Sequence, residues 1–263
     1  MSPVASRIVV AAILLPIVLG LVWLGGWWLF GLALVGGLLA LHELYGMARS
    51  LGPVVLAGYA GLVLTLLGAQ LGGPTWLLAG ILATVPATLL LFFVSSARQH
   101  AVAGFSVTLL GVAWVGGGLA LLLLLRDIPL DGRLLVFTTL LAVFADDTAA
   151  YVVGRAIGRH RMSPAISPGK TWEGFVAGTL AAVGVTFFAL YEQDVLTNAE
   201  SLVLGLVIAL AATLGDLFES AVKRDLGMKD SGRLLGGHGG VLDRLDAPLW
   251  AGAAAYVTLL ALT

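Results

Sequence analysis

The sequence predicts an all-α, polytopic integral membrane protein with about nine transmembrane helices. Of its 263 residues, 59% are hydrophobic and only 11% are charged, and the mean hydropathy is +1.02. In soluble domains about a quarter of the residues are charged, whereas this chain repeatedly contains apolar runs of about 18 residues, long enough to cross a bilayer. Because the chain has no cysteine, disulfides and thiolate ligands are excluded, and a metal would have to be held by Asp, Glu or His.

Length and polarity divide the chain into nine candidate spans. They cover residues 6–25, 27–48, 53–72, 75–95, 103–125, 133–155, 172–191, 200–222 and 246–263. The first span could be read as a signal peptide, because Arg7 precedes an apolar core. However, no Ala-x-Ala site follows it, and the hydrophobic run continues through Trp27 and Trp28, so a first membrane helix is the better interpretation.

The organisation along the chain favours a single membrane domain over residues 1–263. No internal repeat, soluble domain or low-complexity tail interrupts the succession of spans. Glycine pairs such as Gly36–Gly37 suit close helix packing in lipid, and the first 130 residues carry little other chemistry. We therefore expect residues 1–130 to form a helical scaffold and residues 131–263 to form the catalytic half.

The basic residues predict how the chain is oriented. On the nine-span arrangement, 12 of the 14 Lys and Arg residues fall on one side. These are Arg7, Arg49, Arg98, Arg155, Arg159, Arg161, Lys170, Lys223, Arg224, Lys229, Arg233 and Arg244. Only Arg126 and Arg133 fall on the other side. The positive-inside rule then places the N-terminus in the cytoplasm and the C-terminus outside, as expected for a multi-pass protein of the cell (inner) membrane.

Acidic residues inside the spans indicate a polar site at one depth of the membrane. Glu43, Asp146, Asp147, Asp216 and Glu219 all lie within about two turns of the cytoplasmic ends of their spans. A carboxylate in hydrocarbon costs at least about 2.5 kcal/mol and is by default functional or paired. This pattern predicts a polar bowl that faces the cytoplasm. A cation-coupled transporter, the alternative from another functional class, would need polar groups through the whole thickness of the membrane.

The stretch from Ser220 to Asp246 holds the highest concentration of charge in this apolar chain. Asp216, Ser220 and Lys223 recur at i, i+4 and i+7, which places them on one helical face. Asp216 can therefore face a metal while Lys223 faces a phosphate. The alternative is an internal Asp–Lys pair without a catalytic role, although seven residues on one helix are too far apart for direct contact.

The last span is preceded by two carboxylates and a glycine-rich run. Asp243 and Asp246 flank its entry, where Asp246 could simply cap the helix. Together with Asp147 and Asp216 they supply hard oxygen ligands of the kind that Mg²⁺ uses beside substrate phosphates. Residues 236–240, Gly-Gly-His-Gly-Gly, would let backbone N–H groups approach a phosphate closely, although such a run is also typical of a plain flexible link.

Three ordered blocks resemble one enzyme family. They are DTAAYVVGR at residues 147–155, SPGKTWEG at residues 167–174, and the pattern KR…KD…HGG…DRxD between Lys223 and Asp246. Over residues 147–246 the chain resembles the phosphatidate cytidylyltransferases, also called CDP-diacylglycerol synthases. The Gly-Lys-Thr triplet at Lys170 does not belong to a nucleotide P-loop, which would need a glycine where Pro164 stands.

The resemblance implies that the protein converts CTP and phosphatidate to CDP-diacylglycerol and diphosphate in phospholipid biosynthesis. It also implies Mg²⁺, leaves open a second, monovalent cation such as K⁺, and implies a homodimer without a nucleic-acid partner. The unbroken pattern favours this reaction over related CTP-dependent lipid enzymes, such as a polyprenol kinase or an ether-lipid CDP-archaeol synthase.

On this interpretation the candidate site residues fall into three sets. The expected metal ligands are Asp147, Asp216, Asp243 and Asp246. The expected catalytic residues are Lys223, Arg224, Lys229, Asp243 and Asp246. The expected substrate-binding residues are Ser167, Lys170, Thr171, Lys223, Arg224, Lys229, His238, Gly239, Gly240 and Arg244.

Overall fold

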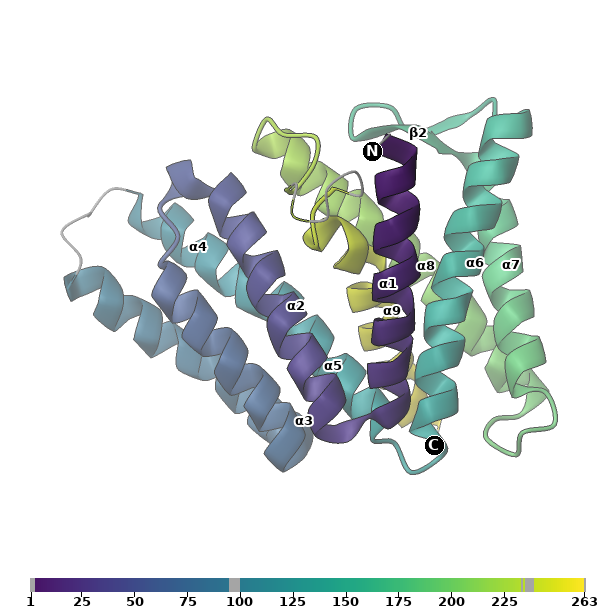
Figure 1. The fold of residues 1–263 in the computed structure, drawn as a ribbon, viewed down its shortest axis with the longest axis horizontal. Coiled ribbons are helices and arrows are strands. Elements are labelled where there is room, and N and C mark those ends of the chain that lie inside the picture. Colours follow the sequence, from purple (N-terminus) through teal and green to yellow (C-terminus); the bar gives the residue numbers. More distant parts are fainter. Residues whose placement is uncertain (1–2, 95–99, 233, 235–238, 263) are drawn as a thin grey trace. The chain divides into compact units, whose positions relative to one another are not determined.

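The computed structural model describes residues 3–94, 100–232, 234 and 239–262, and in this part the chain is almost entirely helical (Figure 1). The α-helices are α1 Pro3–Leu24, α2 Gly26–Met47, α3 Val55–Val94, α4 Ala101–Gly111, α5 Gly117–Arg126, α6 Gly132–Ile157, α7 Trp172–Leu190, α8 Asn198–Asp225 and α9 Leu242–Leu262. A 3₁₀ turn, η1, covers Arg49–Leu51, and a π-helical segment, η2, joins α4 to α5 over Val112–Gly116. A short hairpin, β1 Arg161–Ser163 and β2 Ser167–Thr171, joins α6 to α7.

These helices confirm the predicted all-α, polytopic membrane fold. Seven described segments are long and apolar enough to cross a membrane: α2, α3, α4 through α5 as one segment, α6, α7, α8 and α9. Ala12–Leu24 within α1 is apolar but shorter. Residues 55–72 and 75–94 of the two expected spans 53–72 and 75–95 both lie in α3, where Gly73 adopts non-helical angles, φ 70° and ψ −154°. The exact number of nine spans stays a prediction.

The chain divides into two compact units. One comprises Met1–Leu124 together with Leu226–Leu245, and the other comprises Leu125–Asp225 together with Asp246–Thr263. The second unit thus contains most of the predicted catalytic half, whereas the charged loop that follows α8 belongs to the first. The expectation of a single domain stays a prediction, and each unit is described by itself below.

In the first unit, α2 packs against α3 and against the η2 segment, and glycines allow the close approach. A Cβ on Gly37 would lie 2.9 Å from Leu119 Cδ1, and one on Gly111 would lie 2.8 Å from the Tyr45 hydroxyl. The Tyr45 hydroxyl donates a buried hydrogen bond of 2.9 Å to the carbonyl of Thr108. Small residues therefore let these helices approach each other, as is usual when lipid surrounds them.

In the second unit, α6, α7 and α8 pack against one another, and α6 and α7 run side by side (Figure 1). Glycines again mark the closest contacts, because a Cβ on Gly205 would lie 2.7 Å from the Cα of Val183. Helix α9 joins this group through Gly215, where a Cβ would lie 2.6 Å from the Trp250 ring. This tightly packed helix group carries Asp146, Asp147, Asp216 and Asp246, which are described below.

The β1–β2 hairpin leads directly into α7, and the sequence did not predict it. Arg161 pairs with Thr171 and Ser163 pairs with Ser167 in an antiparallel arrangement. Thr171 is the N-cap of α7, because its side chain accepts a hydrogen bond of 3.2 Å from the Gly174 N–H. Strands this short, with Pro168 inside one of them, leave no alternating pattern to recognise.

We expect Gly178→Ala to destabilise the protein by about 1–3 kcal/mol, because overpacking a helix contact costs that much. A Cβ there would lie 2.6 Å from Asp146 Oδ1 and 2.8 Å from the Asp146 carbonyl oxygen. Gly184→Ala on the same helix is the matched control, because no atom lies within 4 Å of its Cβ position. Thermal unfolding in detergent should show a lower melting temperature for Gly178→Ala only. Equal melting temperatures for the two variants would contradict this close contact.

Candidate active site

Four aspartates from three helices form an acidic cluster in the second unit. Asp146 and Asp147 lie on α6, Asp216 on α8 and Asp246 on α9. Asp246 lies close enough to Asp216 and Asp147 for their charges to repel, and Asp146 is likewise close to Asp147 and Asp216. Three of the predicted metal ligands, Asp147, Asp216 and Asp246, are therefore brought together here.

Asp146 is the most buried member of the acidic cluster, with 3% of its surface exposed. Its Oδ1 has no hydrogen-bond partner among the described residues, and Gly178 on α7 leaves the space that this oxygen occupies. Sequence reasoning noted its depth in the membrane but did not include it among the site residues. Its position next to Asp147 was the available signal.

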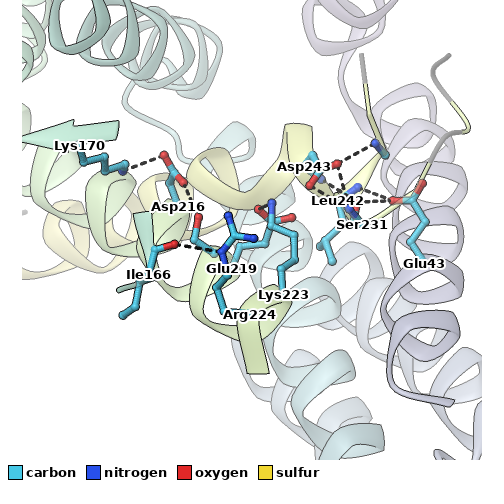
Figure 2. Close-up of polar contacts among 12 residues, drawn as sticks. Glu43, Ile166, Lys170, Asp216, Glu219, Lys223, Arg224, Ser231, Leu242 and Asp243 are labelled. Atoms are coloured by element: carbon cyan, nitrogen blue, oxygen red, sulfur yellow. Dashed lines mark hydrogen bonds and ion pairs between the residues drawn. The ribbon is translucent and has the colours of Figure 1, made fainter. Parts of the chain in front are cut away.

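Lys170 forms an ion pair with the acidic cluster (Figure 2). Its Nζ lies 2.7 Å from Asp216 Oδ2, and the two side chains are only 23% and 30% exposed. Ser220 donates a hydrogen bond of 3.4 Å to the other oxygen, Asp216 Oδ1. Asp216 and Ser220 thus share one face of α8, as the sequence predicted. Both carboxylate oxygens of Asp216 thus contact a polar partner.

The two basic residues at the end of α8 contact different partners. Lys223 Nζ lies 2.6 Å from Glu219 Oε2, one turn earlier on the same helix, and Glu219 is buried. Arg224 Nε donates a hydrogen bond of 3.3 Å to the Ile166 carbonyl in the hairpin (Figure 2). Neither Glu219 nor Ile166 was among the predicted site residues. Glu219 could have been found as the acid at i−4 from Lys223, whereas no sequence signal indicates Ile166.

The predicted hydroxyl contacts lie on the hairpin beside Lys170. Ser167 begins β2 and is partly exposed, whereas Thr171 is 3% exposed and its hydroxyl caps α7. Both belong to the strand that carries Lys170, so the hairpin places these three side chains on one short segment. Their contacts to substrate stay a prediction.

The loop between α8 and α9 belongs to the first unit, and Asp243 organises it. The Asp243 carboxylate accepts hydrogen bonds from the Ser231 N–H, at 3.2 and 3.1 Å to its two oxygens, and from the Gly240 N–H at 2.8 Å. Gly239 has φ +83°, a conformation that favours glycine. Helix α9 begins at Leu242, so Asp246 lies inside the helix and does not cap it.

Of the other predicted residues in this loop, Lys229 and Arg244 are exposed to solvent. His238 lies outside the described residues, together with the first two glycines of its run.

Glu43 on α2 contacts this loop from a distant part of the sequence. It is buried, and its Oε2 accepts hydrogen bonds from the Ser231 hydroxyl at 3.0 Å and from the Leu242 N–H at 2.9 Å (Figure 2). Sequence reasoning placed Glu43 at the depth of the polar bowl but assigned it no role. A single carboxylate in an apolar span was the signal that indicated its importance.

The donor chemistry of the acidic cluster fits a hard cation such as Mg²⁺. Carboxylate oxygens are its preferred ligands, and a divalent charge would relieve the repulsion among Asp147, Asp216 and Asp246. The unpartnered oxygen of Asp146, within the described chain, adds a further available acceptor. In the described residues no three Asp, Glu or His side chains already stand in a metal-binding arrangement. Lys170 Nζ contacts one Asp216 oxygen instead.

Comparison with known proteins gives a consistent result along the whole chain. A profile of the cytidylyltransferase family matches residues 5–262. The phosphatidate cytidylyltransferase of Staphylococcus haemolyticus is 34% identical over 246 residues, which cover 92% of this chain and 93% of that protein. The phosphatidate cytidylyltransferase of Brucella melitensis is 37% identical over 264 aligned positions, covering 98% of this chain and 93% of that protein.

A mycobacterial relative matches over a shorter region. The phosphatidate cytidylyltransferase of Mycobacterium bovis is 44% identical over 131 residues. This region covers 50% of the present chain but only 43% of that relative, so the match spans less than half of its length. The similarity to it is therefore regional, whereas the other two relatives match over nearly their full length.

Proposed function

Because the chain belongs to the cytidylyltransferase family, we propose that it is an enzyme of phospholipid biosynthesis that makes CDP-diacylglycerol and diphosphate from CTP and phosphatidate. The observation that carries this proposal is the near-full-length similarity to phosphatidate cytidylyltransferases. The acidic cluster with Lys170 beside it is the group of residues that such a reaction requires.

In the proposed reaction, a phosphate oxygen of phosphatidate attacks the α-phosphorus of CTP. A P–O bond forms there, the bond to the oxygen that bridges to the β-phosphorus breaks, and diphosphate leaves with the electron pair. The nucleophile is already ionised near neutral pH, so the protein needs to orient the phosphates and neutralise their charge more than it needs a base. This explains why cations and carboxylates dominate the candidate site.

We assign the metal role to Asp216, Asp243 and Asp246, with Asp147 as a further ligand or as an acid that contacts a ligand. Bound Mg²⁺, with or without a monovalent ion such as K⁺, would neutralise the phosphate oxygens of CTP. The phosphate-binding role falls to Lys170, Lys223, Arg224 and Lys229. Supporting contacts fall to Ser167, Thr171, His238, Gly239, Gly240 and Arg244. The ion pair of Lys170 with Asp216 holds its ammonium group at the acidic cluster, and the ion pair of Lys223 with Glu219 holds the second ammonium group on α8.

The predicted orientation completes the proposal. Phosphatidate presents its phosphate at the membrane surface and CTP is supplied from the cytosol, so the site should open to the cytoplasm at headgroup depth. The positive-inside count supports an N-terminus in the cytoplasm of the cell (inner) membrane and a C-terminus outside. A homodimer belongs to the same proposal.

The test is to incubate the purified full-length protein with phosphatidate, Mg²⁺ and CTP that is labelled both in the cytosine ring and in the γ-phosphate, and to separate the lipid products. We expect labelled CDP-diacylglycerol and one diphosphate per product, and no product when Mg²⁺ is chelated. An ether-lipid phosphate and a polyprenol serve as competing substrates. If the protein prefers one of these lipids, that lipid and not phosphatidate is the substrate. If no lipid becomes labelled, the enzymatic function is rejected in favour of a transporter.

A further inference from the structure

We propose that Glu43 is a positioning residue for the cytidylyl transfer reaction, which acts through Ser231 and Leu242 on the loop that carries Lys229 and Asp243. The inference rests on the proposed function, because it concerns the same reaction. It assigns a specific task to α2, a helix that the sequence places in the scaffold half of the chain. Glu43 does not need to touch substrate to fulfil it.

The hydrogen bonds of Glu43 hold the middle of this loop and the start of α9 at one carboxylate oxygen. Oε2 accepts from the Ser231 hydroxyl, which directly follows the Lys229–Asp230 pair, and from the Leu242 N–H at the first residue of α9. A carboxylate at a helix N-terminus also interacts favourably with the helix dipole. Glu43 thereby brings together Ser231 and Leu242, which follow it in the chain by 188 and 199 positions.

Ser231 connects Glu43 to Asp243 through hydrogen bonds. Its N–H donates to both Asp243 oxygens at 3.2 and 3.1 Å, and its hydroxyl oxygen accepts from the Asp243 N–H at 3.4 Å. The Gly240 N–H donates to Asp243 as well, at 2.8 Å. The orientation of the Asp243 carboxylate therefore depends on where Glu43 holds Ser231.

Two glycines make room for the Glu43 carboxylate inside the loop. A Cβ on Gly232 would collide with Glu43 Oε1, and a Cβ on Gly240 would collide with Glu43 Oε2 and with the Ser231 hydroxyl. The loop backbone thus approaches the carboxylate more closely than any other residue type would permit. Glu43 is only 5% exposed, so its effect on a reaction must pass through these contacts.

The experiment compares Glu43→Ala, Glu43→Gln and Ser231→Ala with the wild type, using full-length protein in lipid nanodiscs. Tyr45→Phe is the matched control, because it removes a buried hydrogen bond from the same helix without a described contact to the loop. For each protein we would measure kcat, KM for phosphatidate, and hydrogen–deuterium exchange of the loop between α8 and α9.

We expect Glu43→Ala to lower kcat by about a hundredfold, the cost of misplacing a reacting group by about 1 Å, while KM for phosphatidate stays within about twofold. Glu43→Gln should lower kcat by no more than about fivefold, because one amide oxygen can accept both hydrogen bonds, although more weakly than a carboxylate. The backbone amides of this loop should exchange hydrogen faster in Glu43→Ala than in the wild type. Their exchange rates should be unchanged in Tyr45→Phe. If Glu43 only stabilised the fold, its removal would not lower kcat while leaving KM unchanged, and glutamine would not restore kcat.

Ser231→Ala should lower kcat by about tenfold, and combining it with Glu43→Ala should add little, because both changes break one connection. If Glu43→Ala does not fold, Ser231→Ala and Glu43→Gln decide the question. A folded Glu43→Ala or Ser231→Ala protein with wild-type kcat, beside an active wild type, would overturn the positioning role. A wild type that makes no CDP-diacylglycerol would instead reject the proposed function.

Discussion

Asp216→Asn is expected to reduce CDP-diacylglycerol formation by about a thousandfold, the largest effect that we predict for one residue. A metal ligand contributes several kcal/mol of charge stabilisation, and each 1.36 kcal/mol corresponds to a factor of about ten in rate. Asp216 lies beside Asp246, and both of its oxygens contact polar partners, Lys170 and Ser220. An amide in its place keeps the shape but removes the charge that attracts both Lys170 and a cation.

The measurement is the initial rate at saturating CTP and phosphatidate across a series of Mg²⁺ concentrations. Asp225→Asn is the control, because Asp225 ends the same helix and is exposed, and its rate should stay within about twofold of the wild type. A second measurement is the rise in melting temperature caused by Mg²⁺ with CTP, which Asp216→Asn should lose. A folded Asp216→Asn protein with full Mg²⁺-dependent turnover would make the metal assignment wrong.

Lys170→Met is expected to lower the rate between about a hundredfold and a thousandfold, as removal of a charge-stabilising donor does in other transferases and hydrolases. The lysine forms an ion pair with Asp216, with 2.7 Å between Nζ and Oδ2. Its loss should leave the acidic cluster more negative, which opposes the approach of a triphosphate. We therefore expect both a lower kcat and a higher KM for CTP.

Two variants separate charge from geometry at this position. Lys170→Arg keeps the positive charge but changes the shape of the donor, so we expect a partial recovery that leaves the rate about tenfold low. Arg161→Gln is the control on the same hairpin, because it removes an exposed charge from β1 and should change the rate by less than about twofold. Equal losses for Lys170→Met and Arg161→Gln would indicate a general effect of net charge on substrate binding.

The sequence predicted the helices well because their apolar length is a local property. The expected span 133–155 corresponds to α6 at Gly132–Ile157, and 172–191 corresponds to α7 at Trp172–Leu190. The expected last span began at residue 246, whereas α9 begins at Leu242. In the extra turn the Asp243 carboxylate accepts a hydrogen bond from the Gly240 N–H, a contact that apolar length does not predict because Asp243 is charged.

The site was predicted only in part, because motifs identify residues but not their partners. The helical spacing in α8 indicated Asp216 and Lys223, and the motif before the last span indicated the DRxD pair. The contact of Glu43 with Ser231 spans 188 positions and leaves no trace in local spacing. The pairing of Lys223 with Glu219 follows the i, i+4 spacing of a helix, which sequence alone can indicate. Long-range contacts of this kind require the folded chain.

The hairpin joins α7 without a linker, and this restricts how Lys170 can change partners. The next residue, Thr171, is buried and caps α7, and the Trp172 N–H donates to the His160 carbonyl. The backbone at Lys170 is thus held on its C-terminal side by a helix end. Lys170 Nζ would then exchange Asp216 for a phosphate by rotation of its side chain alone. Such a rotation is faster than a loop movement and leaves the hairpin unchanged.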